Sequence, residues 1–189
     1  KNKLLNIMKV AVIGLGYVGL PLSLYLAKKV SVTGFDLNKK KIRSLKNKID
    51  LNKEANADMF KKAKNITFTS DEKQLKNQDI YIIAVPTPVD KKNKPDLSLL
   101  LLATKTVAKY IKNQSIVIIE STVYPGTTEE ICVPLIEKIS KLKFLKDNFN
   151  SNDIGFYCGF CPERVNPGDK KHKLNRITKV ISGSSVIAI

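Results

Sequence analysis

The chain of 189 residues contains little cysteine, histidine or acidic side chain, and each shortage narrows what the protein can be. Three cysteines, a small and odd number, argue against a disulfide framework and agree with a reducing compartment such as the cytoplasm. The single histidine, His172, leaves few side chains that could complete a metal site. The sequence also lacks internal repeats, low-complexity tracts and flexible linkers, so we expect one domain of ordinary size.

Acidic residues are outnumbered by basic ones, 17 to 33, which gives a net charge of +16. Such a charge favours anionic partners. The lysines are spread along the whole chain, however, and no basic block interleaves with aromatic residues as a nucleic-acid surface requires. We therefore expect a solvated, lysine-rich surface and no nucleic-acid partner. The alternative, charge-driven binding of nucleic acid, predicts salt-sensitive retention on DNA.

An uncharged run from Val10 to Ala27, preceded by lysines, has the look of a short membrane span or a signal peptide. Three glycines and Pro21 interrupt it, and no small-residue cleavage site of the usual kind follows. We therefore expect no membrane association, and the cytoplasm is the predicted location.

Short apolar runs alternate with segments of helical periodicity. This alternation predicts an α/β fold: a doubly wound, Rossmann-type parallel sheet with helices on both faces, over residues 9–189. The expected strand order is 3-2-1-4-5-6. The predicted strands are Lys9–Gly14, Ser31–Phe35, Ile66–Thr69, Asp79–Val85, Ser115–Glu120, Ile154–Phe160 and Ile177–Ser182. One predicted helix follows the glycine-rich turn near Val18. The other predicted helices cover about Asn38–Lys48, Lys53–Lys64, Asp96–Ile111 (with Asp96 as cap) and Thr127–Lys141.

The first strand runs into Gly14-Leu15-Gly16-Tyr17-Val18-Gly19, which matches the dinucleotide-binding pattern G-x-G-x-x-G. Gly14 permits the tight turn, Gly16 lets the backbone approach a pyrophosphate, and Gly19 allows the helix to pack against the strand. Asp36 ends the next strand at the usual distance, where it would accept hydrogen bonds from the adenosine ribose. This favours NAD over NADP, although Lys39, Lys40 and Lys41 lie nearby.

Ligands of such sheets lie at the carboxyl ends of the strands, where the strand order reverses. That crevice is expected between the first and fourth strands. The fourth strand ends at Pro86-Thr87-Pro88 and the fifth at Glu120-Ser121-Thr122, so Thr87 and Thr122 are predicted beside the nicotinamide half of the cofactor. Ordinary turn chemistry explains the same residues equally well.

Cys158 and Cys161 form a C-x-x-C pair, which elsewhere indicates redox or metal chemistry. Residues three apart on a strand face opposite sides, and a metal would have to recruit Cys132 and His172 as well. We favour structural cysteines and expect no metal site.

Four segments together resemble the UDP-glucose/GDP-mannose dehydrogenase family, and within it the UDP-N-acetylglucosamine and UDP-N-acetylgalactosamine 6-dehydrogenases of bacterial polysaccharide synthesis. The resemblance covers about residues 9–183. The segments are Val-Ile-Gly-Leu-Gly-Tyr-Val-Gly-Leu-Pro at 12–21, Ala-Val-Pro-Thr-Pro at 84–88, Glu-Ser-Thr-Val-Tyr-Pro-Gly-Thr-Thr at 120–128 and Cys-Pro-Glu-Arg-Val-Asn-Pro-Gly-Asp at 161–169.

The resemblance implies an oxidoreductase that converts the C6 alcohol of a UDP-N-acetylhexosamine to a carboxylate through two hydride transfers to NAD, with a cysteine that captures the intermediate aldehyde. It implies that Glu163 lies near the reacting carbon, where it could orient or deprotonate water. The residues it places on NAD are Tyr17, Val18, Asp36, Thr87 and Thr122, and those it places on the nucleotide sugar are Arg164 and Val165.

Members of this family continue into a central helix and a second, UDP-sugar-binding domain, and the full-length proteins are homo-oligomers. Those parts supply the nucleophilic cysteine, and none of them can be placed before Ile189. The expectation is therefore a chain that binds NAD but is inactive alone. The alternative is a non-catalytic NAD-binding module that is complete as it stands, or a truncated paralogue.

Overall fold

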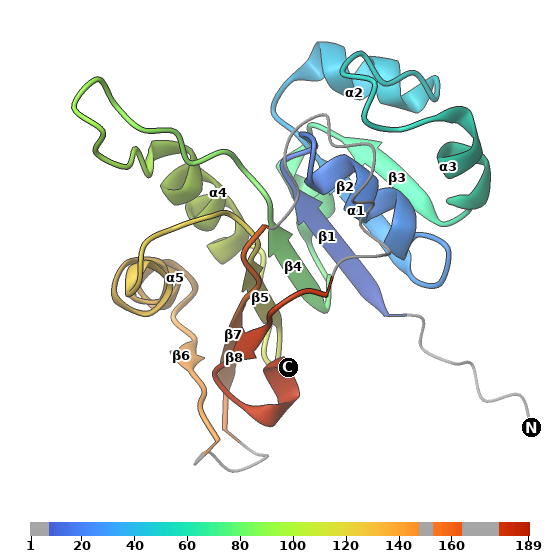
Figure 1. The fold of residues 1–189 in the computed structure, drawn as a ribbon. Helices are drawn as coiled ribbons and strands as arrows, with labels where there is room; N and C mark the ends of the chain where they lie inside the picture. The colour runs from blue at the N-terminus through green and yellow to red at the C-terminus, as the bar shows by residue number, and fades with distance from the viewer. Residues whose placement is uncertain (1–7, 148–152, 164–177) are drawn as a thin grey trace, which may run out of the picture.

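The computed structural model describes residues 8–147, 153–163 and 178–189, and shows a twisted sheet in the order β3-β2-β1-β4-β5-β7-β6 (Figure 1). Neighbouring strands of this path pair in parallel, and β8 adds antiparallel to β7. The strands are β1 (Lys9–Ile13), β2 (Ser31–Phe35), β3 (Ile66–Thr69), β4 (Ile80–Ile83), β5 (Ile116–Ile119), β6 (Lys143–Phe144), β7 (Gly155–Phe160) and β8 (Ser182–Gly183). The predicted fold class and the order of the first six expected strands are confirmed.

Helices cover both faces of the sheet, and each face has its own apolar core. The helices are α1 (Gly19–Leu26), α2 (Lys39–Lys46), α3 (Ala57–Lys62), α4 (Ser98–Ala108) and α5 (Val133–Ser140). Successive β1 residues point to opposite faces: Val10 and Val12 pack with α1, α2 and α3, while Ala11 and Ile13 pack with α4 and α5. This explains why the strand is apolar from Val10 to Ile13, after the exposed Lys9.

The run Val10–Ala27 is thus a buried strand, a glycine turn and an eight-residue helix. Among the residues that the structure describes, no helix is both long and apolar enough to cross a bilayer.

Three expectations about elements need correction. The expected helix 127–141 is divided into a π-helical segment, η2 (Thr127–Cys132), and α5, because Pro134 in the first turn of α5 has no N–H for a continuous α-helical ladder. The short strand β6 was not predicted. The expected strand Ile177–Ser182 is wrong: residues 178–181 are not strand, and only Ser182 and Gly183 pair with β7.

The physical reason lies at the edge of β7. Ser182 pairs antiparallel with Phe160, the last residue of β7, so in this register residues 178–181 lie beyond the carboxyl end of β7 and have no strand of the described residues beside them. Apolar composition identifies a strand former but not how much free edge it will find.

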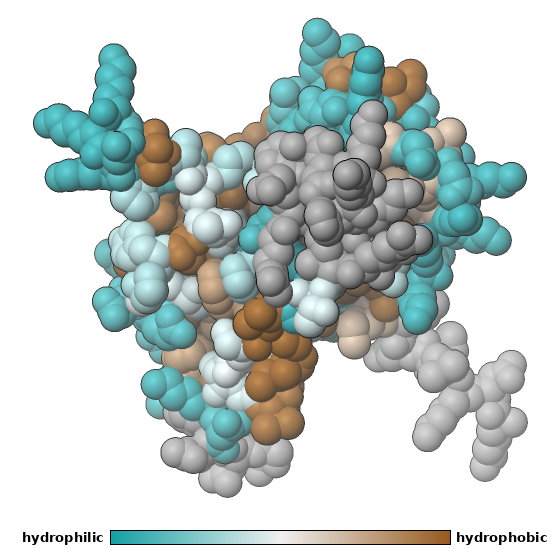
Figure 2. Space-filling view, in the orientation of Figure 1, coloured by the Kyte–Doolittle hydropathy of each residue, from teal (hydrophilic) through white to brown (hydrophobic). Residues whose placement is uncertain are grey.

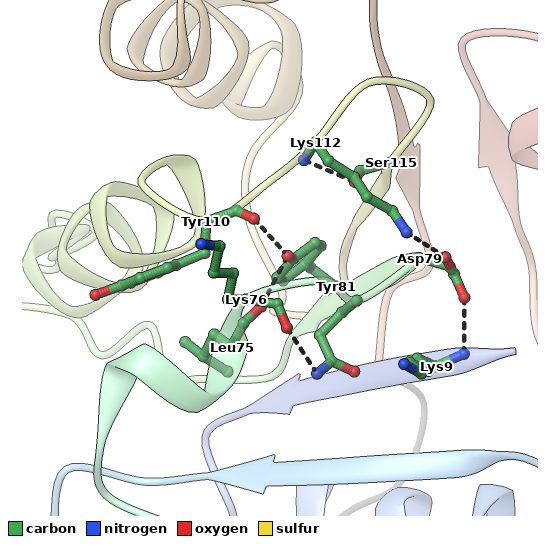
Figure 3. A network of polar contacts seen from close by, with 9 residues as sticks. Lys9, Leu75, Lys76, Asp79, Tyr81, Tyr110, Lys112 and Ser115 are labelled. Carbon is green, nitrogen blue, oxygen red and sulfur yellow. Dashed lines mark hydrogen bonds and ion pairs between the residues drawn. The ribbon is translucent and has the colours of Figure 1, made fainter.

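The amino ends of β1 and β4 are joined by a polar network (Figure 3). Asp79 accepts a hydrogen bond from the backbone N–H of Lys9 (2.9 Å) and forms an ion pair with Lys112 (2.7 Å). The buried hydroxyl of Tyr81 lies 2.9 Å from the carbonyl oxygen of Leu75 and 2.8 Å from that of Tyr110. These contacts fix the end of the sheet opposite to the strand ends that form the candidate site.

Candidate functional site

The turn between β1 and α1 requires glycine at two positions for packing. Gly14 has a φ of +93°, and a Cβ there would lie 2.7 Å from the carbonyl oxygen of Ala84. A Cβ on Gly19 would lie 1.9 Å from the carbonyl oxygen of Gly14. The first glycine therefore allows the chain to leave the strand, and the last lets α1 begin directly against it, as predicted.

Gly16 serves a different purpose, because a Cβ at this residue would meet no atom within 4 Å. The residue lines a cleft, and the open space lies above the start of α1. Val18 at the N-cap of α1 provides no side-chain cap. In the first turn the N–H of Leu20 donates to the carbonyl oxygen of Gly16 (3.1 Å) and Pro21 has no N–H, so the N–H groups that a ligand can use lie before Leu20. Space, uncapped N–H groups and the positive end of the helix dipole together suit a phosphate.

Asp36 lies directly after β2 and faces this turn. Its carboxylate accepts hydrogen bonds from the backbone N–H groups of Leu15 (3.1 Å) and Asn38 (2.9 Å) and pairs with Lys41 (2.8 Å). The carboxylate is thus fixed at the side of the glycine turn. The pairing with Lys41 was not predicted, since three consecutive lysines gave no sign of which one would face inward.

The cleft has a volume of about 280 Å³ and lies where the carboxyl ends of β1, β4 and β5 meet. It contains six of the residues that the sequence analysis selected: Gly16, Tyr17, Val18, Thr87, Thr122 and Glu163. The other lining residues are Ala84, Val85, Pro86, Pro88, Glu120 and Ser121. Segments far apart in the sequence therefore converge at the position where the strand order reverses, between β1 and β4 (Figure 1).

The segments after β4 and β5 are tied together by hydroxyl groups. Thr87 Oγ1 donates to the carbonyl oxygen of Thr122 (2.5 Å), and Ser121 Oγ donates to that of Val85 (2.7 Å). These bonds hold the two loops that form one wall of the cleft.

Two carboxylates line the cleft, Glu120 and Glu163. Glu120 is buried and forms an ion pair with Lys179, from the segment before β8. Burial lowers the pKa of Lys179. Sequence reasoning missed this pair because its partners are 59 residues apart and Lys179 is one of many lysines.

The cysteines are buried and free. Cys132 and Cys158 belong to the core between the sheet, α4 and α5. Burial raises the pKa of the thiols of Cys132, Cys158 and Cys161, which disfavours the reactive thiolate form. In the described part of the chain, no three His, Cys, Asp or Glu side chains are grouped as metal ligands.

Arg164 and Val165, the residues expected at the nucleotide sugar, lie outside the described residues, as does His172. Glu163, directly before them, is the last described residue of that motif.

The described residues fit a dinucleotide: an open glycine at an uncapped helix start, a fixed carboxylate beside it, and a cleft that continues over the next two strands. Together with the doubly wound sheet, they define a dinucleotide-binding domain. The sequence matches the UDP-glucose/GDP-mannose dehydrogenase family, NAD binding domain, over residues 8–186. The chain belongs to this family, and it is its NAD-binding domain.

Curated relatives agree with this assignment. The chain is 47% identical over 178 residues to UDP-N-acetyl-D-glucosamine 6-dehydrogenase of Salmonella typhi, which covers 94% of this chain and 40% of that protein. It is 50% identical over 177 residues to Protein CapL of Staphylococcus aureus, with the same coverage. The chain therefore spans about 40% of the length of these relatives.

Solved structures show the same fold. The NDP-N-acetyl-D-galactosaminuronic acid dehydrogenase of Methanosarcina mazei Go1 superposes with a TM-score of 0.80 at 28% identity, over 96% of this chain and 40% of that one. The UDP-D-ManNAc dehydrogenase of Pyrococcus horikoshii gives 0.75 at 30% identity, over 96% and 42%.

Proposed function

We propose that the cleft holds NAD across the glycine turn. The N–H groups at the start of α1 and the open face of Gly16 receive the pyrophosphate, Tyr17 and Val18 contact the cofactor beside it, and Asp36 accepts the adenosine ribose hydroxyls. Thr87 and Thr122 lie beside the nicotinamide half. The observation that carries this proposal is the Cβ position of Gly16, which is empty and faces the cleft while those of Gly14 and Gly19 are filled.

We further propose that the whole protein is a UDP-N-acetylhexosamine 6-dehydrogenase. Relatives that are 47% identical to this chain are named UDP-N-acetyl-D-glucosamine 6-dehydrogenases. NAD, when bound, accepts the hydride. Glu163 lies in the same cleft as Thr87 and Thr122, where it would orient or deprotonate water. Arg164 and Val165 are proposed to contact the nucleotide sugar.

The nucleophilic cysteine is proposed to lie outside this chain. Cys132, Cys158 and Cys161 are buried, with thiol pKa values raised by that burial, so none of them suits attack on an aldehyde. We therefore expect the 189-residue chain to bind NAD without turning over a UDP-sugar. Incubation with NAD and UDP-N-acetylglucosamine, followed by NADH absorbance, should show no sustained reduction. Steady turnover would contradict the proposal that the nucleophilic cysteine lies outside this chain.

The cofactor preference tests the role of Asp36. The unchanged chain should bind NAD more tightly than NADP, because the carboxylate accepts the ribose hydroxyls and repels a 2′-phosphate. Asp36→Ala should weaken NAD binding and narrow or reverse the preference, since Lys41 is then left without its partner. Asp58→Asn is the matched control, because Asp58 forms an exposed pair with Lys62 on α3. Equal loss of NAD affinity in both variants would contradict the role.

A further inference from the structure

Glu120 and Lys179 form an ion pair in the wall of the cleft. Glu120 follows β5, and its backbone N–H donates to the carbonyl oxygen of Ile83, the last residue of β4 (2.9 Å), which continues the β4–β5 ladder one residue beyond β5. Its side chain is 4% exposed and contacts Nζ of Lys179, which is 22% exposed. The glutamate lines the cleft together with Thr87 and Thr122.

The position of the pair follows from the proposed function, on which this inference rests. With the pyrophosphate at Gly16 and the adenosine beside Asp36, the remaining half of the dinucleotide must extend the other way, over the ends of β4 and β5. Glu120 stands at the end of β5. The nicotinamide ring and the ion pair therefore share the same part of the cleft.

The nicotinamide ring carries a positive charge in NAD and none in NADH, whereas the rest of the two molecules is alike. A net charge in the nearby wall therefore changes the ratio of the two affinities rather than only their average. We propose that the Glu120–Lys179 pair sets the relative affinity of the cleft for NAD and NADH, because Lys179 neutralises the buried carboxylate that faces the ring. A reaction with two hydride transfers requires the release of NADH each time, and an unpaired carboxylate would bias the cleft toward NAD.

The two single variants shift the ratio in opposite directions. Glu120→Gln keeps the shape of the side chain and leaves the cation of Lys179 unpaired. This cation weakens the binding of NAD relative to that of NADH. Lys179→Met leaves the carboxylate of Glu120 unpaired, and this anion strengthens the binding of NAD relative to that of NADH. At about 10 Å and an effective dielectric constant of about 20, one unit charge changes the affinity ratio on the order of tenfold. The double variant Glu120→Gln/Lys179→Met removes both charges and returns the ratio to that of the unchanged chain.

The test is a titration of each variant with NAD and with NADH, by calorimetry and NADH fluorescence, at one ionic strength. Circular dichroism checks folding, because an unpaired buried charge is destabilising; the neutral double variant and the reversed pair Glu120→Lys/Lys179→Glu retain a balanced wall and serve if a single variant does not fold. The exposed pair Glu72–Lys109 (3.2 Å) is the matched control. Glu72→Gln and Lys109→Met change the net charge of the molecule equally, but they lie outside the cleft lining and should leave the ratio unchanged.

Opposite shifts in the two single variants, with the wild-type ratio in the double variant, support the proposal. If neither single variant folds, the neutral double variant and the reversed pair carry the test. The NAD/NADH affinity ratio of the unchanged chain in both of them supports the proposal, and a shifted ratio in either overturns the proposal. An unchanged ratio in a folded single variant, or an equal shift in the Glu72–Lys109 controls, overturns it as well. If the unchanged chain binds neither NAD nor NADH, the proposed function itself is overturned. That outcome differs from a failure of the ion-pair proposal, in which the unchanged chain still binds both cofactors.

Discussion

Gly16 and Gly19 lie three residues apart in one turn, but the space at their Cβ positions differs. The Cβ position of Gly19 is occupied by backbone, whereas that of Gly16 is open to the cleft. A methyl group added at Gly16 therefore meets nothing in the protein, but it enters the space proposed for the pyrophosphate. The two positions separate the stability of the turn from its binding function.

Alanine at each position tests this separation. Gly16→Ala should change the free energy of unfolding by no more than about 0.5 kcal/mol and weaken NAD binding at least about tenfold. Gly19→Ala should destabilise the chain by about 2 kcal/mol or more, because α1 must move away from Gly14. Denaturant unfolding and NAD titration measure both effects. Normal NAD affinity in Gly16→Ala would show that the phosphate does not pass over this residue.

Among the strand elements, β4 and β5 are joined at both ends by polar contacts of different purpose. At the carboxyl end, Thr87 bonds to Thr122 and Ser121 to Val85, beside the cleft. At the amino end, Tyr81 and Asp79 bind neighbouring segments (Figure 3). Changes at the first set should alter binding, and changes at the second should alter only stability.

Thr87→Val removes the hydroxyl that bonds to Thr122 but keeps the shape of the side chain. We expect NAD affinity to fall about three- to tenfold, the effect of one hydrogen bond worth about 1 kcal/mol, because the two cleft loops lose one of their two links. Thr87→Ser retains the hydroxyl and should bind nearly as the unchanged chain does. Calorimetric titration compares the three proteins. A Thr87→Ser variant as weak as Thr87→Val would exclude the hydroxyl as the cause.

Tyr81→Phe removes the hydroxyl that lies 2.9 Å from the carbonyl oxygen of Leu75 and 2.8 Å from that of Tyr110. Unfolding should become easier by about 1–2 kcal/mol, with NAD affinity unchanged. Burial also raises the pKa of Tyr81 to about 12. Since the folded state favours the neutral phenol, its contribution is complete below pH 10, the ordinary tyrosine pKa, and declines toward pH 12. Unfolding curves across this range should therefore differ less between Tyr81→Phe and the unchanged chain as the pH rises.

Sequence patterns predicted the buried strands well because each is a short apolar run bounded by turn residues. They also predicted the packing roles of Gly14 and Gly19, which depend on local backbone geometry. Lys179 as the partner of Glu120 could not be predicted, since that pairing depends on how distant segments meet. The strand expected at Ile177–Ser182 failed for a related reason: in the antiparallel register of β8, the residues directly before Ser182 lie beyond the carboxyl end of β7.

At the scale of the whole molecule, 33 basic and 17 acidic residues give a net charge of +16, and Figure 2 shows hydrophilic side chains over α2, α3 and the loop before α4. Several exposed apolar side chains lie near β8, namely Val180, Ile181, Val186, Ile187 and Ile189. Figure 2 shows an apolar area on this side of the molecule. The residues proposed to contact NAD lie in the turns that follow β1, β2, β4 and β5, whereas Lys179, the partner of Glu120 in the cleft wall, directly precedes Val180 of this area.

Calorimetric titration of NAD into the 189-residue chain tests the central claim most directly. We predict one saturable site per chain, and a stabilisation of about 2.7 kcal/mol when free NAD reaches one hundred times its dissociation constant. NADP should bind more weakly under the same conditions. A chain that folds but shows neither heat of binding nor stabilisation at millimolar NAD would contradict the account.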